Sequence, residues 1–232
     1  MFPLRDNVPS YKKPYVTCLI IAVNTIIFLI QFIMPEKLNE LFVYVYGFVP
    51  AIFSKAVIEN TLTGQNFYPF FTSMFLHGNW LHLISNMWTL WLFGDNIEDR
   101  LGHFRFIIFY LLCGLSAMVC HFIFYPGSPV PAIGASGAIA GVMGAYFILF
   151  PYARIQTLFI PIFIIPVFLR IPAVIYLGIW FLTQLYNGAI NSVLGGRGSG
   201  VAWWAHIGGF IGGIVLLKLM YKRKYRRPVY YE

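Results

Sequence analysis

The chain has 232 residues, of which 59% are hydrophobic and only 10% are charged. Water-soluble domains carry about 25% charged residues, so this composition excludes an ordinary soluble domain and indicates an integral membrane protein. The formal net charge is +8. In a membrane protein an excess of Lys and Arg sets the orientation of the spans, and we therefore expect no nucleic acid among the partners.

Long apolar runs predict the membrane-spanning helices, because a helix needs about 20 apolar residues to cross the hydrocarbon core. The N-terminal segment is polar and precedes a run long enough to span, so we expect no cleavable signal peptide. Residues 36–70 form an unusually apolar first loop that we expect in the membrane interface. The predicted spans are 16–35, about 77–94, 105–125, 136–151, 171–190 and 202–219.

These spans predict an all-α polytopic membrane protein with three parts. We expect a cytoplasmic N-terminal segment at 1–15, one six-helix domain at 16–220 and a basic cytoplasmic tail at 221–232. Six spans place both ends on one side, and of the 16 Lys and Arg residues only Lys37, Lys55 and Arg197 fall on the other side. The positive-inside rule therefore predicts cytoplasmic termini and a multi-pass protein of the cell membrane.

Four polar side chains fall at similar depth on three predicted spans that run in the same direction. His82 and Asn86 lie four residues apart on the second span, Ser136 opens the fourth, and His206 lies in the first turns of the sixth. Polar side chains within a membrane are unfavourable unless they meet one another or water. We therefore expect these four residues to converge in the outer part of the bilayer.

Small residues on two of these spans would allow such an approach, because they let membrane helices pack closely. Close packing of the fourth span against the sixth would bring Ser136 within reach of His206. The small residues are Gly137, Gly141 and Gly144 on the fourth span, and Ala205, Gly209, Gly212 and Gly213 on the sixth.

The four polar groups suit nucleophilic catalysis. A serine hydroxyl becomes an effective nucleophile when a neighbouring base takes its proton, and His206 is the candidate base for Ser136. His82, Asn86 and the backbone N–H of Ser136 are candidate donors to an oxyanion. Since no acidic residue is expected at this depth, the sequence predicts a Ser–His dyad, with no metal and no cofactor.

Four motifs in chain order resemble the rhomboid intramembrane serine proteases: "HGNWLHLISN", "GDNIEDRLG", "GASG" and "AHIGG". The resemblance implies that Ser136 is the nucleophile, that His206 is the base and that His82 and Asn86 hold the oxyanion. It also implies supporting positions at His77, Gly134, Ala140 and Gly209. The family often has an aromatic residue where this chain has Ala140, and we expect an added ring there to be tolerated.

The resemblance implies a six-helix bundle with a membrane-associated first loop. The implied activity is hydrolysis of a peptide bond in or near the transmembrane segment of another membrane protein, within the lipid bilayer. The sequence indicates no oligomeric state. Two alternatives stay open: a haem-binding or transport protein with His82 and His206 as axial ligands, and an inactive family member that binds membrane clients.

Several other residues receive structural interpretations. A helix-capping role and a functional role for His77 are equally consistent with the sequence. Glu98 with Arg100 is expected to form a clamp at the inner membrane face, and His103 and His121 are assigned no role. The polar residues inside spans are expected to bond between helices; they are Asn24, Gln31, Thr183 and Gln184.

Overall fold

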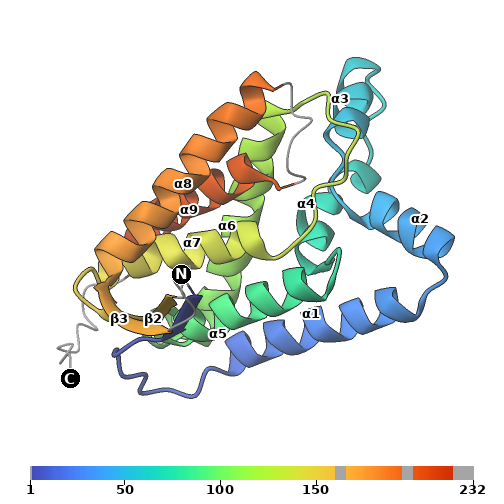
Figure 1. The fold of residues 1–232 in the computed structure, drawn as a ribbon. Helices are drawn as coiled ribbons and strands as arrows, with labels where there is room; N and C mark the ends of the chain where they lie inside the picture. The colour runs from blue at the N-terminus through green and yellow to red at the C-terminus, as the bar shows by residue number, and fades with distance from the viewer. Residues whose placement is uncertain (1, 160–165, 195–200, 222–232) are drawn as a thin grey trace.

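The computed structural model describes residues 2–159, 166–194 and 201–221, and most of them are helical (Figure 1). The elements in chain order are β1 (Phe2–Arg5), α1 (Tyr15–Ile33), α2 (Glu36–Tyr46), α3 (Pro50–Ile58), η1 (Gly64–Asn66), α4 (Pro69–Thr72), η2 (Ser73–Phe75), α5 (Trp80–Leu101), α6 (His103–Phe124), α7 (Ser136–Leu149), β2 (Arg154–Phe159), β3 (Val167–Pro172), α8 (Ala173–Val193) and α9 (Trp203–Met220).

Each of the six predicted spans corresponds to a helix: α1, α5, α6, α7, α8 and α9. Among the described residues, α1, α6, α8 and α9 are long and apolar enough to cross a membrane, and α7 is a shorter apolar helix. Large apolar side chains are exposed along α1 and α8, such as Ile33 (79%) and Val193 (87%). These exposed faces suit lipid, and the prediction of an all-α polytopic membrane fold is confirmed.

Helix α5 extends beyond the predicted end at residue 94. It continues through the charged "DNIEDR" segment and ends at Leu101, before Gly102, whose φ of 78° suits a glycine. Two polar side chains of this continuation are buried: Asn96 donates to Val8 O at 3.2 Å, and Glu98 is 1% exposed.

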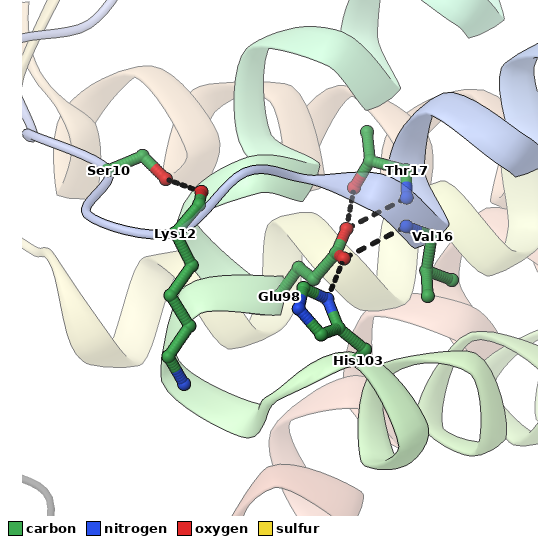
Figure 2. Close-up of polar contacts among 6 residues, drawn as sticks. All are labelled: Ser10, Lys12, Val16, Thr17, Glu98 and His103. Carbon is green, nitrogen blue, oxygen red and sulfur yellow. Dashed lines mark hydrogen bonds and ion pairs between the residues drawn. The ribbon is translucent and has the colours of Figure 1, made fainter.

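Glu98 holds the first turn of α1 (Figure 2). Its carboxylate accepts from the backbone N–H groups of Val16 (2.9 Å) and Thr17 (2.8 Å) and from the Thr17 hydroxyl (2.7 Å). His103 Nδ1 lies 2.5 Å from the same carboxylate. A negative charge at a helix N-terminus is favourable, so Glu98 ties α1 to α5 and to the start of α6.

This clamp differs from the predicted one in its partner. Arg100 does not pair with Glu98; its guanidinium lies over the Phe150 ring, 5.2 Å from the centroid. His103, which was assigned no role, is the side-chain partner of Glu98 instead. The pattern of charges alone favoured the nearer cation, but residues two apart on a helix do not face each other.

A three-stranded antiparallel sheet was not predicted. Its order is β1-β2-β3, and β1 belongs to the segment 1–15 that was expected only as a cytoplasmic N-terminal segment. The sheet lies at one end of the bundle, beside the ends of α7 and α8 and the N-terminus, whereas α2 and α3 lie at the other end (Figure 1). The sheet therefore covers the end of the bundle that is remote from Ser136.

The first loop is folded against the segment that leads into α7. Phe48 and Ala132 exchange backbone hydrogen bonds of 3.1 and 2.8 Å. The Phe48 ring packs on Phe70, with 4.3 Å between ring centroids. The loop thus supports the approach to Ser136, and its position in the membrane interface stays a prediction.

Helix α7 is the buried centre of the bundle, since residues 137–146 are all buried. Glycines of α9 allow close contact with α7: a Cβ on Gly209 would lie 1.9 Å from Gly137 O, and one on Gly213 would lie 2.0 Å from Gly141 O. The predicted close packing of these helices is confirmed. Gly137, Gly141 and Gly212 also face α6, where an added Cβ would lie 2.5 Å or less from Ala117, Cys113 and Ser116, respectively.

Candidate active site

Ser136 and His206 meet where α7 and α9 begin. Ser136 is the first residue of α7, and His206 is in the first turn of α9. His206 Nε2 lies 2.8 Å from Ser136 Oγ. The side chains that the sequence placed at equal depth are therefore within hydrogen-bonding distance, and the glycine contacts between α7 and α9 account for this approach.

The other ring nitrogen of His206 is bonded to α8. His206 Nδ1 lies 2.8 Å from Gln184 Oε1. The amide nitrogen of Gln184 lies 3.1 Å from the backbone carbonyl of Trp180 and 3.2 Å from Thr183 Oγ1. A carbonyl can only accept a hydrogen bond, so the Gln184 NH₂ faces Trp180 and its oxygen faces the imidazole.

This orientation of the amide determines the tautomer of His206. Because Gln184 presents an oxygen, Nδ1 must carry the proton and donate it. In the neutral ring Nε2 then has a lone pair, which accepts from the Ser136 hydroxyl. The chain of hydrogen bonds from Ser136 to Trp180 O thus leaves His206 ready to take a proton at Nε2.

The sequence predicted only part of the role of Gln184. It was expected to bond between helices, which is confirmed, but His206 was not named as its partner. The other polar residues inside the predicted spans differ in whether they bond to another segment or to their own helix. Gln31 also bonds to other segments, accepting from His77 N at 3.1 Å, whereas Asn24 and Thr183 donate to carbonyls of their own helices.

The α5 residues approach Ser136 from the opposite side, at Gly134. A Cβ on Gly134 would lie 2.6 Å from His82 Nε2 and 3.7 Å from Asn86 Nδ2. Gly134 has a φ of 119°, which side-chain-bearing residues rarely adopt, and its N–H donates to Ser73 O at 2.9 Å. Only glycine fits here, so the backbone two residues before Ser136 can pass directly against His82.

His77 contacts both His82 and Asn86. Its Nε2 is 3.0 Å from Asn86 Nδ2, and its ring centroid is 5.0 Å from that of His82. An amide nitrogen can only donate, so His77 Nε2 accepts from Asn86. His77 is thus placed to position Asn86, which the capping and functional interpretations had left open.

The surroundings of Ala140 differ from the expectation. Ala140 is 0% exposed, and a Cβ on Gly209 would lie 3.4 Å from its methyl group. Aromatic rings near His206 come instead from Trp180 and Trp203, with centroids 5.9 and 6.2 Å from that of the imidazole. An added ring at Ala140 would have no vacant space, so we no longer expect it to be tolerated.

The contacts of His206 also disfavour the haem alternative. Both of its ring nitrogens have hydrogen-bond partners, Ser136 and Gln184, and an axial ligand needs one of them for iron. Across the described part of the chain, no group of three or more His, Cys, Asp or Glu residues could hold a metal ion.

The helical bundle, with a polar cluster enclosed where α5, α7, α8 and α9 approach one another, defines a polytopic helical membrane protein with an internal polar site. A family model described as the rhomboid domain matches residues 64–223, which is more than half of the chain. The protein therefore belongs to the rhomboid family.

Individual relatives match shorter stretches. The rhomboid protease GluP of Bacillus subtilis is 33% identical over 134 residues, covering 57% of this chain and 24% of that protein. The mitochondrial rhomboid protein 1 of Saccharomyces cerevisiae is 31% identical over 166 residues, covering 67% and 43%. The human presenilin-associated rhomboid-like protein is 34% identical over 100 residues, covering 41% and 26%. The chain thus spans less than half the length of these relatives.

Proposed function

We propose that this protein is an intramembrane serine endopeptidase that cleaves peptide bonds in or near transmembrane segments of other membrane proteins. The observation that carries the proposal is the 2.8 Å separation of Ser136 Oγ and His206 Nε2. Membership of the rhomboid family and similarity to a protein named as a rhomboid protease support it.

In the proposed acylation step, Ser136 Oγ attacks the substrate carbonyl carbon while its proton moves to His206 Nε2. The imidazolium then donates that proton to the leaving amide nitrogen, the C–N bond breaks, and the new amine departs. His206 carries a positive charge between these events. Gln184 Oε1, 2.8 Å from Nδ1, would stabilise that charge and hold the ring in plane with Ser136.

The tetrahedral intermediate places a negative charge on the former carbonyl oxygen. Ser136 is the first residue of α7, so its backbone N–H is one of the four that have no acceptor within the helix. With Asn86 Nδ2 and His82 Nε2 beside Gly134, this N–H would form a set of donors for the oxyanion.

Deacylation repeats the steps with water. His206 Nε2 takes a proton from water, the resulting hydroxide equivalent attacks the acyl carbon, and Ser136 leaves with the proton returned by His206. No step requires a metal or a cofactor. Water must therefore reach Ser136, which is partly exposed in the structure.

We further propose a multi-pass arrangement in the cell membrane with both termini cytoplasmic. The bias of Lys and Arg supports this orientation. Helix α7 has 14 residues and spans about 21 Å, less than the roughly 30 Å hydrocarbon core. If its C-terminal end lies at the cytoplasmic surface, Ser136 lies within the outer half of the bilayer.

A serine-directed fluorophosphonate tests the proposal directly. The purified protein should be labelled, Ser136→Ala should not be, and Ser85→Ala, which removes an exposed hydroxyl from α5, should be labelled as the parent is. A folded protein that neither labels nor cleaves a model transmembrane substrate in liposomes would overturn the assignment and favour the inactive, client-binding alternative.

A further inference from the structure

Three arginines share one face of the β1-β2-β3 sheet. The strand register sets Arg5 opposite Gln156, and Gln156 opposite Arg170, in a single row across the sheet. Arg5 Nε donates to Gln156 Oε1 at 2.6 Å. Arg154 is two residues from Gln156 and therefore lies on the same face, while Ile155 between them is buried beneath the sheet.

These arginines line a cavity of about 490 Å³ at the end of the bundle remote from Ser136. The size suits a small polar ligand or headgroup. The cavity is closed on one side by the turn after β1, which is attached to β2 because Arg154 N donates to Asn7 Oδ1 at 2.7 Å. The site is therefore a walled recess and more than an exposed row of charges.

Arginines outnumber acids in this recess, since three arginines and a single carboxyl group line it. Within the described residues, none of the three arginines forms an ion pair. Asp6 is the one carboxyl group of the lining, and it is already engaged by the Tyr146 hydroxyl. Like charges brought close together repel, so three guanidinium groups gathered around one recess indicate an anionic ligand.

The neighbouring surface is apolar. Phe168 lies two residues from Arg170 on the same face of β3 and is 59% exposed. An exposed aromatic ring beside arginines suits a membrane surface, where the ring enters the lipid and the arginines stay at the depth of the headgroups.

We propose that the recess formed by Arg5, Arg154 and Arg170 binds the phosphate of an anionic membrane lipid. Guanidinium groups bind phosphate oxygens in pairs of parallel hydrogen bonds, and basic pockets on the cytoplasmic side of membrane proteins bind lipid headgroups. The bound lipid would link the N-terminal strand to the α7–α8 connection. This binding is independent of Ser136 and of any cleavage.

Lipid titration of the full-length protein in a neutral detergent, followed by native mass spectrometry, tests the site. We expect retained phosphatidylglycerol, at least tenfold weaker retention of phosphatidylcholine with the same chains, and competition by inorganic phosphate only at far higher concentration. The variant Arg5→Gln/Arg154→Gln/Arg170→Gln should bind phosphatidylglycerol about 100-fold more weakly, because each cation near a headgroup contributes about fivefold and the three factors multiply.

A matched control removes the same charge elsewhere. Lys12→Gln/Lys13→Gln/Lys218→Gln alters three exposed cations outside the recess and should retain the lipid. Equal loss in both variants would overturn the proposal in favour of general surface attraction. Tight binding of inorganic phosphate without preference for phosphatidylglycerol would overturn the lipid assignment and leave a site for a soluble phosphate ester.

A single substitution guards against misfolding of the triple variant. Arg154→Lys keeps the charge and the backbone bond to Asn7 but loses the paired hydrogen bonds that a guanidinium forms. It should weaken phosphatidylglycerol retention severalfold while the thermal midpoint without lipid stays the same. Unchanged retention in this variant would show that Arg154 does not contact the phosphate and would overturn the site as drawn.

Discussion

Gln184 on α8 and His206 on α9 are joined by a hydrogen bond of 2.8 Å between Oε1 and Nδ1. The Trp180 carbonyl holds the far end of the same amide at 3.1 Å. Together these contacts give His206 the one neutral tautomer in which Nε2 can accept from Ser136. The chain has alanine where its family often has an aromatic residue, and this amide supplies the orientation of the imidazole by another route.

Replacing Gln184 by methionine should therefore reduce turnover and leave substrate binding almost unchanged. Methionine has a similar shape but cannot accept the Nδ1 proton strongly. A hydrogen bond to a charged group contributes about 1.5–3 kcal/mol, so the loss at the imidazolium stage should lower kcat by roughly 10- to 150-fold. Steady-state cleavage in liposomes would separate kcat from KM.

Two further variants distinguish a hydrogen-bonding role of Gln184 from a packing role. Gln184→Glu keeps an acceptor facing Nδ1 and should retain more activity and faster fluorophosphonate labelling than Gln184→Met. Asn187→Leu removes another amide from α8, one whose Nδ2 donates to Thr183 O, and should label normally. Equal labelling rates in the parent and Gln184→Met would assign Gln184 to packing alone.

The proposed dyad predicts that losses of activity from substitutions at Ser136 and His206 are not additive. Ser136→Ala and His206→Ala should each abolish cleavage, and the double variant should be no worse than either one, because the two groups act as a unit. Both variants should unfold at temperatures near that of the parent. Independent, multiplying losses in kcat would contradict a shared step, and near-parental cleavage by either single variant would remove that residue from the mechanism.

Asn86→Ala should slow turnover much more than it weakens binding. Removal of one oxyanion donor typically lowers kcat by 10²–10³, or about 2.7–4 kcal/mol. Residual activity should remain because His82 and the Ser136 N–H are still present. His77→Ala separates the two roles of this contact: it frees Asn86 from its 3.0 Å partner and should reduce kcat less than Asn86→Ala does. Unchanged kcat in Asn86→Ala would assign Asn86 to structure.

Ala140→Tyr should destabilise the protein. Ala140 is fully buried against Gly209 on α9, and overpacking a tight contact costs about 1–3 kcal/mol. We expect a lower thermal midpoint and reduced cleavage, since separation of α7 from α9 would also separate Ser136 from His206. Ala140→Ser adds a single atom and serves as the control. A tyrosine variant with the parental midpoint would show that the helices can make room.

The helices could be predicted from the sequence because their signal is local. A run of apolar residues needs only its own composition to indicate a span. The sheet could not be predicted this way, since β1 pairs with β2 across about 150 residues, as Arg5 with Gln156, and β1 itself has four residues that include a proline. Such pairing depends on how the bundle brings the N-terminus to the α7–α8 connection.

The residues of the site also include some that the sequence predicts and some that it does not. Ser136, His206, His82 and Asn86 could be grouped because polar residues at equal depth in apolar spans are rare and must find partners. Gln184 carried the same signal, but its contact with His206 depends on the rotation of α8 about its own axis, which neighbouring polar residues such as Thr183 and Asn187 do not reveal. The partner of Glu98 likewise depended on where α6 begins.

The last prediction concerns where substrates are cut. Helix α7 has 14 residues and is about 21 Å long, so Ser136 would lie below the outer membrane surface. The scissile bond must therefore reach that depth, near the outer end of a substrate helix. A helical carbonyl is already hydrogen-bonded and shielded by side chains, and attack therefore needs a locally extended segment. Glycine, proline or polar residues below the cut favour unwinding.

The measurement is cleavage of a model transmembrane substrate in liposomes, with product ends mapped by mass spectrometry. We expect cuts near the outer end and much slower cleavage when leucines replace the helix-breaking residues. A matched substrate with leucines placed only at the cytoplasmic end should be cut at the parental rate, because that part of the helix stays folded during attack. Cuts at the cytoplasmic end would contradict the depth of Ser136, and equal rates for all three substrates would contradict the need for unwinding.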